Sequence, residues 1–193
     1  DQKFIETLTG QAVIAIKNAH EYERARKVAQ VRDALIDIVN ILLQQTDEKE
    51  IFSIILQKAL EITESTKGTI SKSDEDRREL KFVVQVGLKE EWKDKPISFD
   101  MGVAGKVARE KRIIKIDQVS TDPLKDEFID AFPGEEESEL AVPILDGEKV
   151  MGVINIESEA PFHFEEDDVE LVKSLATLCA VAIKNAENIS QKQ

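Results

Sequence analysis

The sequence predicts an α/β fold, and three features support that prediction. Apolar residues recur at helical spacing near both ends of the chain. Between these ends, several short segments alternate apolar and polar residues with the period of a β-strand. Two such segments, 138–145 and 149–158, flank the dipeptide Asp146-Gly147, which is favoured in the tight turn of a β-hairpin. We therefore expect paired strands between terminal helices.

Composition limits the classes of protein and partner. The chain has 193 residues, with 26 Lys and Arg against 39 Asp and Glu, so its formal net charge is −13. This charge repels phosphates, which argues against nucleic acid or an anionic membrane as a partner. No apolar run approaches the ~18 residues of a membrane span. The single cysteine fits a reducing compartment, and we expect a cytoplasmic protein.

The first 45 residues predict one long connector helix, because they lack proline and carry apolar seams with alternating steps of three and four. The register of the seams breaks near Ala25, and two shorter helices with a bend there are the alternative. A helix of this length exceeds what a small domain can cover, so we expect part of it to pack against a second copy of the chain. The predicted seam residues are Leu8, Ala12, Ala15, Ala19, Leu35, Ile38 and Leu42.

The beginning of the chain is similar to its end. The segment Ala12-Val-Ile-Ala-Ile-Lys-Asn-Ala19 nearly repeats as Cys179-Ala-Val-Ala-Ile-Lys-Asn-Ala186. Such self-similarity suggests repeated units, although two alanine-rich helices can also look alike by chance. We predict that the final helix continues the dimer seam through Leu175, Cys179, Ala182 and Ala186.

The middle of the chain predicts a helix followed by short strands. Thr46 and the acidic residues after it favour a helix start, and an apolar face continues to Ile62. Strands are predicted at 69–73 and 80–87, with a charged turn between them. A short strand is predicted at 97–100.

A second helix is predicted at 102–111, and a strand at 112–117 follows it. Gly102 and Gly105 let the start of this helix approach other backbone closely. The alternative is that its free amides bind an anion.

The segment 119–137 is the longest predicted loop. It holds seven Asp and Glu residues against one lysine, and Phe128, Ile129 and Phe132 follow helical spacing within it. Long ordered loops often carry binding function, whereas a solvated acidic loop held by its phenylalanines is the alternative. The acidic residues lack the spacing of an EF-hand, which argues against a calcium site.

Motifs within residues 99–156 resemble those of the GAF family of small-molecule sensor domains, and the resemblance extends over roughly 48–186. The resemblance rests on Gly102-Val-Ala-Gly105, Ser138-Glu-Leu-Ala-Val-Pro143 and the hairpin Asp146-Gly-Glu-Lys-Val-Met-Gly-Val153. It implies an antiparallel sheet of about six strands, with long terminal helices packed on one face. It also implies a pocket on the other face, beneath the 103–111 helix and the 119–137 loop. The candidate ligand-binding residues are Phe99, Val103, Phe128, Ile129 and Phe132.

Catalytic motifs are absent from the sequence. There is no nucleophile elbow, Cys-x-x-Cys, His-x-x-His or phosphate-binding loop, so we expect no enzyme activity. Cyclic-nucleotide-binding relatives carry Asn-Lys after the last strand and a Phe-x-x-x-Asp-Glu motif. Here Asn-Lys is missing and Val169 follows Asp168, which argues against a cyclic nucleotide. Bilin-binding relatives attach the chromophore to a cysteine next to the pocket, whereas Cys179 lies on the final helix, which argues against a bilin. The sulfoxide-reducing relatives need several cysteines, and this chain has one.

The resemblance implies a regulatory module of a bacterial-type signalling protein. We expect a connector helix at 1–45, whose start resembles the closing helix of a preceding GAF domain, and a GAF-like sensor domain at 46–193. A parallel homodimer would relay an unidentified ligand, or an upstream event, through its terminal helices to an output domain in the same chain. The alternative is a ligand-free structural module that dimerises and transmits motion.

Overall fold

The computed structural model describes residues 47–135 and 137–190, together with residues 17, 36, 39, 40, 44 and 45. The chain divides into two compact units, 1–40 and 41–193. The second unit contains the sheet and helices described below. The predicted connector helix and its seam residues Leu8, Ala12, Ala15, Ala19, Leu35, Ile38 and Leu42 lie outside the described residues.

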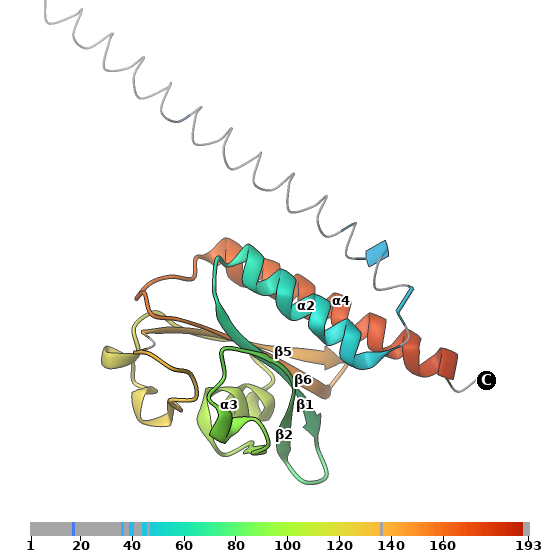
Figure 1. Ribbon diagram of the computed structural model, residues 1–193, viewed down its shortest axis with the longest axis horizontal. Coiled ribbons are helices and arrows are strands. Elements are labelled where there is room, and N and C mark those ends of the chain that lie inside the picture. Colours follow the sequence, from blue (N-terminus) through green and yellow to red (C-terminus); the bar gives the residue numbers. More distant parts are fainter. Residues whose placement is uncertain are drawn as a thin grey trace, which may run out of the picture. The chain divides into compact units, whose positions relative to one another are not determined.

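A six-stranded antiparallel sheet forms the middle layer of the second unit (Figure 1), in the order β3-β2-β1-β6-β5-β4. This arrangement confirms the predicted α/β fold. The hairpin β5–β6 turns at Asp146 and Gly147, as its dipeptide predicts. The strands are β1 (Lys67–Asp74), β2 (Glu79–Val86), β3 (Ile97–Ser98), β4 (Ile114–Ile116), β5 (Ser138–Asp146) and β6 (Lys149–Ser158).

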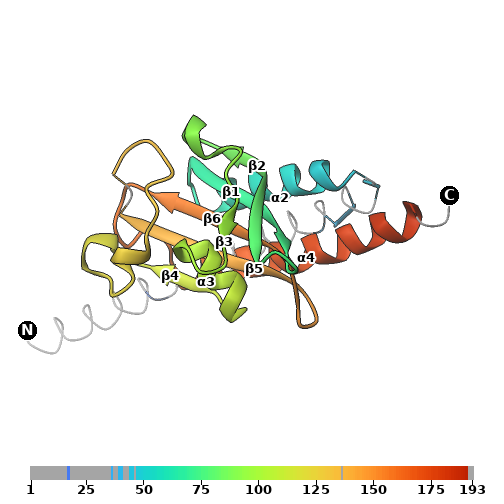
Figure 2. The ribbon, with the colours of Figure 1, turned by 90° about the horizontal axis from the view of Figure 1, so that it is seen from below.

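Helices cover both faces of the sheet. Helices α2 (Glu48–Ile62) and α4 (Glu166–Ser190) lie side by side on one face, and α3 (Gly102–Glu110) lies on the other (Figures 1 and 2). Asp47 is the N-cap of α2, and its Oδ1 accepts a hydrogen bond from the Lys49 amide at 2.8 Å; the predicted cap Thr46 lies outside the described residues. Short 3₁₀ helices are found at Glu90–Trp92, Val119–Thr121 and Lys125–Glu127.

The interior strands β5 and β6 are therefore buried on both sides. On β5, Leu140, Val142 and Ile144 alternate with Ala141, and all four side chains are buried. The six residues from Gly152 to Glu157 on β6 are also buried without interruption. A strand enclosed in this way is expected to be apolar throughout, so any polar side chain on β5 or β6 needs a specific explanation.

The inner face of α4 belongs to this core. Leu175, Cys179, Ala182 and Ala186 are at most 4% exposed, and α4 packs against α2 and β5. The structure thus places the α4 part of the predicted dimer seam inside one chain, because the same residues fill the space between α4, α2 and the sheet.

Two glycines bring α3 close to its neighbours. A Cβ on Gly105 would lie 2.3 Å from the Ser98 carbonyl oxygen, and one on Gly102 would lie 2.4 Å from Ile129 Cδ1. Gly102 also has a φ of +71°, which disfavours any other residue. The interpretation of these glycines as close-packing positions agrees with this geometry.

We predict that Gly105→Ala destabilises the domain, although alanine normally stabilises a helix interior by about 1 kcal/mol relative to glycine. The added methyl group would collide with backbone at Ser98 and Phe99, and such overpacking costs roughly 1–3 kcal/mol. Urea unfolding of the two proteins measures the change. An equal or increased free energy of unfolding would contradict the close packing of α3 on β3.

Candidate functional site

A small internal cavity lies between the sheet, α3 and the segment that precedes β5. Its volume is about 30 Å³, which is room for a water molecule but not for an organic ligand. Strands β1, β2, β5 and β6 supply its floor. The residues that line it are Thr69, Phe82, Leu88, Ile97, Val103, Ala104, Ile129, Ala131, Phe132, Glu139, Asn155 and Glu157.

Three of the five predicted ligand-binding residues line this cavity: Val103, Ile129 and Phe132. Phe99 is buried in the adjacent apolar cluster beneath α3, and Phe128 is only partly buried; neither lines the cavity. The helical spacing of Phe128, Ile129 and Phe132 does not correspond to a helix, because the 3₁₀ helix ends at Glu127 and Phe128 has extended backbone angles. Helical spacing within so short a segment gave little indication of its conformation.

The cavity floor carries a polar cluster, which we define as Thr69, Glu139, Asn155 and Glu157. Each of these side chains is at most 7% exposed. The strand register explains how they meet, since Glu139 pairs with Glu157 across β5 and β6, and Thr69 pairs with Asn155 across β1 and β6. Directly opposed side chains in an antiparallel pair have Cβ atoms only ~5 Å apart, so two buried carboxyl groups are neighbours.

Some acceptor atoms of the polar cluster receive no hydrogen bond from the described residues. The Asn155 Nδ2 donates to Glu157 Oε1 at 3.0 Å. Asn155 Oδ1 and Glu139 Oε2 are buried and have no hydrogen-bond partner among the described residues. Burial raises the pKa of the Glu139 carboxyl to about 8, and the nearby Asn155 amide offsets this rise only in part. Because an unpaired buried charge is costly, Glu139 holds its proton at neutral pH.

The outer wall of the cavity is the segment 127–133, which we call the lid segment. Lysines attach it to the rest of the domain: Lys106 Nζ lies 2.8 Å from Glu127 Oε1, and Lys89 Nζ lies 2.7 Å from Asp130 Oδ1. Lys67 Nζ also donates to the Pro133 carbonyl oxygen. The Asp130 carboxylate is largely exposed, so its pair with Lys89 adds little stability, whereas the Lys106–Glu127 pair is partly buried.

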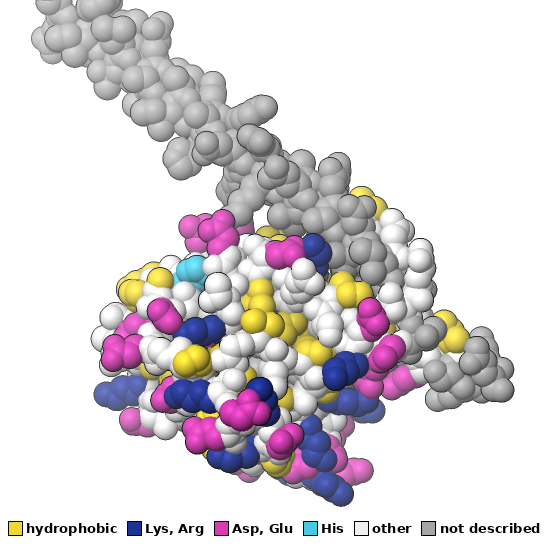
Figure 3. Space-filling view, in the orientation of Figure 1, with side chains coloured by type: hydrophobic (Ala, Val, Ile, Leu, Met, Phe, Trp, Pro, Cys, Tyr) yellow, Lys and Arg dark blue, Asp and Glu magenta, His cyan; other side chains and the backbone are white. Residues whose placement is uncertain are grey.

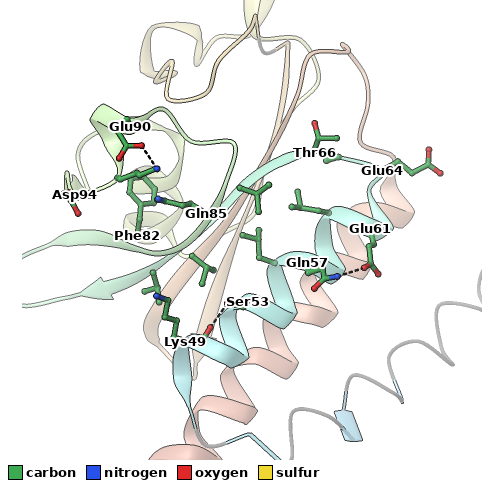
Figure 4. Close-up of a pocket in the computed structure, with 17 residues that line it drawn as sticks. Lys49, Ser53, Gln57, Glu61, Glu64, Thr66, Phe82, Gln85, Glu90 and Asp94 are labelled. Carbon is green, nitrogen blue, oxygen red and sulfur yellow. Dashed lines mark hydrogen bonds and ion pairs between the residues drawn. The ribbon is translucent and has the colours of Figure 1, made fainter.

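A second hollow lies on the opposite side of the sheet, between α2 and β2 (Figure 4). It is an open groove of about 1210 Å³, formed because no described helix covers β2 beyond α2. Its polar groups already bind one another: Gln57 Nε2 donates to Glu61 Oε1 at 3.1 Å, and Lys93 pairs with Glu90. These exposed, mutually satisfied groups offer less specificity than the buried acceptors of the polar cluster.

The visible surface around this groove is mixed in charge. In the space-filling view, Lys and Arg side chains are interspersed with Asp and Glu (Figure 3). This face therefore presents no continuous patch of one charge, and the internal cavity is the better candidate for a ligand site.

The polar cluster was missed at the level of sequence, although a signal was present. Glu139 alternates with Leu140 and Val142, and Asn155 and Glu157 alternate with apolar residues on β6. Such alternation normally indicates a solvated face. Only the presence of α3 and the lid segment on that face makes these polar residues buried.

The family comparison identifies the fold independently. Residues 45–184 match the family model described as "GAF domain". The structure is similar to free methionine-R-sulfoxide reductase from Neisseria meningitidis in complex with its substrate, with 20% identity, a TM-score of 0.71, and coverage of 84% of this chain and 93% of that one.

Two further solved structures are similar to this chain. One is the GAF domain of an Acinetobacter phosphoenolpyruvate-protein phosphotransferase, with 20% identity, a TM-score of 0.70, and coverage of 81% and 94% of the two chains. The other covers residues 122 to 287 of a methyl-accepting chemotaxis protein, with 21% identity, a TM-score of 0.66, and coverage of 79% and 98%. At identities this low, the structural similarity shows that the fold is shared and nothing more.

The described part of the chain holds neither a membrane-spanning helix nor a metal site. No described helix combines the length and the apolar composition of a membrane span. No group of three His, Cys, Asp or Glu residues in that part is arranged to hold a metal ion.

We predict that Glu139→Gln stabilises the domain at pH 8 and changes it little at pH 5. Glu139 binds its proton more tightly in the folded protein than in the unfolded chain, where its pKa is near 4.5. The parent protein therefore loses stability as the pH rises from 4.5 to about 8. The uncharged amide avoids that loss, so we expect a gain of roughly 2–5 kcal/mol at pH 8.

Urea unfolding at the two pH values measures this difference. Glu148→Gln is the matched control, because the Glu148 side chain is almost fully exposed and its replacement should have no pH-dependent effect. A loss of stability at pH 8 on replacing Glu139, or equal effects at both pH values, would contradict the assigned environment of Glu139.

Proposed function

We propose that this chain, which belongs to the GAF domain family over residues 45–184, is a regulatory module that binds a small molecule in its internal cavity. One observation carries the proposal: the cavity combines an apolar wall with buried polar atoms, Glu139 Oε2 and Asn155 Oδ1, that have no hydrogen-bond partner among the described residues. A pocket of this composition is typical of small-molecule sites. The lid segment would move outward to admit a ligand larger than water.

The setting that we propose is a cytoplasmic, bacterial-type signalling protein. A GAF domain of this fold is found in a phosphotransferase, and a segment of a chemotaxis protein has a similar structure, which supports a signalling role. Ligand binding would be relayed through the terminal helices of a parallel homodimer to an output domain in the same chain. On α4, Val181 and Ile189 remain 52% and 41% exposed and lie about two turns apart, so they are better placed than Cys179 to meet a partner.

We further propose that the module is not an enzyme, despite its similarity to a sulfoxide reductase. Cys179 is fully buried on α4, on the opposite side of the sheet from the cavity. Burial raises the pKa of its thiol far above the ordinary value, and Glu48 adds to the rise. Because the thiolate is the reactive form, Cys179 is unsuited to nucleophilic or redox chemistry.

A ligand-free structural module is the second candidate function. The cavity of about 30 Å³ favours it, since Ile129 and Phe132 already occupy most of the space beneath the lid segment. In that case the domain would serve dimerisation and transmit motion, and the cavity would hold only water.

Native mass spectrometry of the chain purified gently from its own host tests the proposal. We expect a dimer that carries a discrete additional mass. In Ala104→Leu the larger side chain would fill the cavity that Ala104 lines, so the additional mass should be lost while the dimer persists. A clean dimer without added mass in the parent protein would favour the structural module, and a monomer would remove the dimer relay.

The matched control is Ala160→Leu, at an exposed position outside the cavity. This variant should retain the additional mass. Retention of the mass by Ala104→Leu as well would place the ligand outside the internal cavity.

We predict that Cys179 does not react with a thiol reagent in the native protein and reacts fully in urea. Its complete burial and its raised thiol pKa both suppress reaction. Absorbance of the released thiolate from an aromatic disulfide reagent measures the rate. Rapid modification of the folded chain would contradict both the core position of Cys179 and the argument against thiol chemistry.

A further inference from the structure

The polar cluster is rich in acceptors and poor in donors. Glu139 Oε2 and Asn155 Oδ1 have no partner among the described residues. The amide orientation of Asn155 follows from its contact with Glu157, because a carboxylate oxygen only accepts and must face the Nδ2 donor. Asn155 therefore turns its acceptor oxygen toward the remaining space. Once Glu139 has lost its proton, Glu139 Oε2 and Asn155 Oδ1 are both pure acceptors, and a cationic hydrogen-bond donor would complete the cluster.

The charge of the cluster is also incompletely balanced. Lys67 is the β1 register partner of Glu157, and its Nζ lies 2.6 Å from Glu159 Oε1. Glu139 has different neighbours: its register partners are Glu157 on β6 and the apolar Ile116 on β4. Among the described residues that line the cavity, none is Lys or Arg. On α3 above the cavity, Lys106 instead pairs with Glu127.

We propose that the polar cluster recognises the ammonium group of a small organic amine, with Glu139 Oε2 and Asn155 Oδ1 as acceptors. The inference rests on the proposed small-molecule function of this cavity and names its ligand class. A primary ammonium carries three N–H donors in a compact group. Two of them would bind these two oxygens, and Thr69, which also lines the cavity, has a hydroxyl that can accept a third.

The remaining walls indicate an organic cation rather than a metal ion. No group of three His, Cys, Asp or Glu side chains in the described part of the chain is arranged to hold a metal ion, and only two of the four side chains in the polar cluster are carboxylates. The other walls are apolar and include Phe82, Leu88, Val103 and Phe132. An aliphatic or aromatic body attached to the ammonium would bury its surface against them.

Binding such an amine requires the lid segment to move, because the present cavity holds little more than water. The Asp130 carboxylate of the Lys89 ion pair is largely exposed, so that pair can be exchanged for water at small cost, whereas the Lys106–Glu127 pair is partly buried and costs more to open. Ligand binding would also remove the proton of Glu139, since the carboxylate is the form that attracts an ammonium. Amine affinity should therefore rise with pH below the pKa of Glu139.

Titration of the full 193-residue chain with three matched probes tests the inference: n-butylamine, 1-butanol and butyrate. The readout is the NMR signal of the Asn155 side-chain amide, which reports directly on the cluster. We expect saturable shifts with n-butylamine and at least tenfold weaker binding of the other two probes. Because aliphatic amines stay protonated below pH ~10, the affinity for n-butylamine should rise up to about tenfold per pH unit between pH 6 and 7.5.

Two variants test whether n-butylamine binding depends on the Glu139 carboxyl group. Glu139→Gln, which we expect to fold stably, should weaken n-butylamine binding at least tenfold and abolish its pH dependence. Glu148→Gln should bind as the parent protein does. The inference is overturned if the Asn155 amide does not respond to n-butylamine, if 1-butanol or butyrate binds as tightly, or if Glu139→Gln binds unchanged.

These outcomes separate the ligand class from the proposed function. Binding of 1-butanol or butyrate at the Asn155 amide would reject the ammonium while leaving a small-molecule cavity in place. A discrete additional mass in the native protein, without any response to n-butylamine, would do the same. If the native protein carries no additional mass and the Asn155 amide responds to no probe, both the ammonium ligand and the small-molecule function are rejected.

Discussion

Burial of the sheet on both faces is the constraint on which the rest of this structure depends. With α2 and α4 on one side and α3 with the lid segment on the other, β5 and β6 have no solvated face. Apolar residues on these strands then supply the core, as expected for an enclosed sheet. The same enclosure turns Glu139 and Asn155 from ordinary polar residues into buried groups with unsatisfied acceptors. The apolar core and the candidate site thus both result from covering the sheet on its two faces.

Burial of this face of the sheet requires α3 to pack closely against it. Only glycine at positions 102 and 105 lets the helix lie against Ser98 and Ile129, and a helix held further away would admit water to the polar cluster. The raised pKa of Glu139 is a result of that exclusion. A buried, protonated carboxyl group reduces stability near neutral pH, and such a cost is typical of sites that are completed by a ligand.

The long helix α4 shows why regular spacing alone does not identify a partner. Its residues Leu175, Cys179 and Ala182 have the heptad spacing expected of a dimer seam. In the structure they pack within one chain, because α2 and the sheet lie beside that face. A different face of the same helix, with Val181 and Ile189, remains exposed. Periodicity reports that a face is apolar, but not which molecule covers it.

The sequence by itself determined the local elements and the family. Alternating periodicity placed the strands, Asp146-Gly147 placed the hairpin turn, and the glycines of α3 indicated close packing. These features are local, because each depends on residues only a few positions apart. Val103, Ile129 and Phe132 were also expected at the pocket, from the resemblance to a family of known fold.

Only the tertiary structure decided which polar residues belong to the site. Glu139 and Glu157 are separated by a hairpin and become neighbours through the strand register, and Thr69 reaches Asn155 from a distant strand. Their burial depends on what covers the α3 face of the sheet, which no local pattern encodes. The partial burial of Phe128 and the core position of Cys179 were likewise decided by packing. Burial is a property of the whole assembly of elements, so a residue's exposure follows from the fold rather than from its neighbours in sequence.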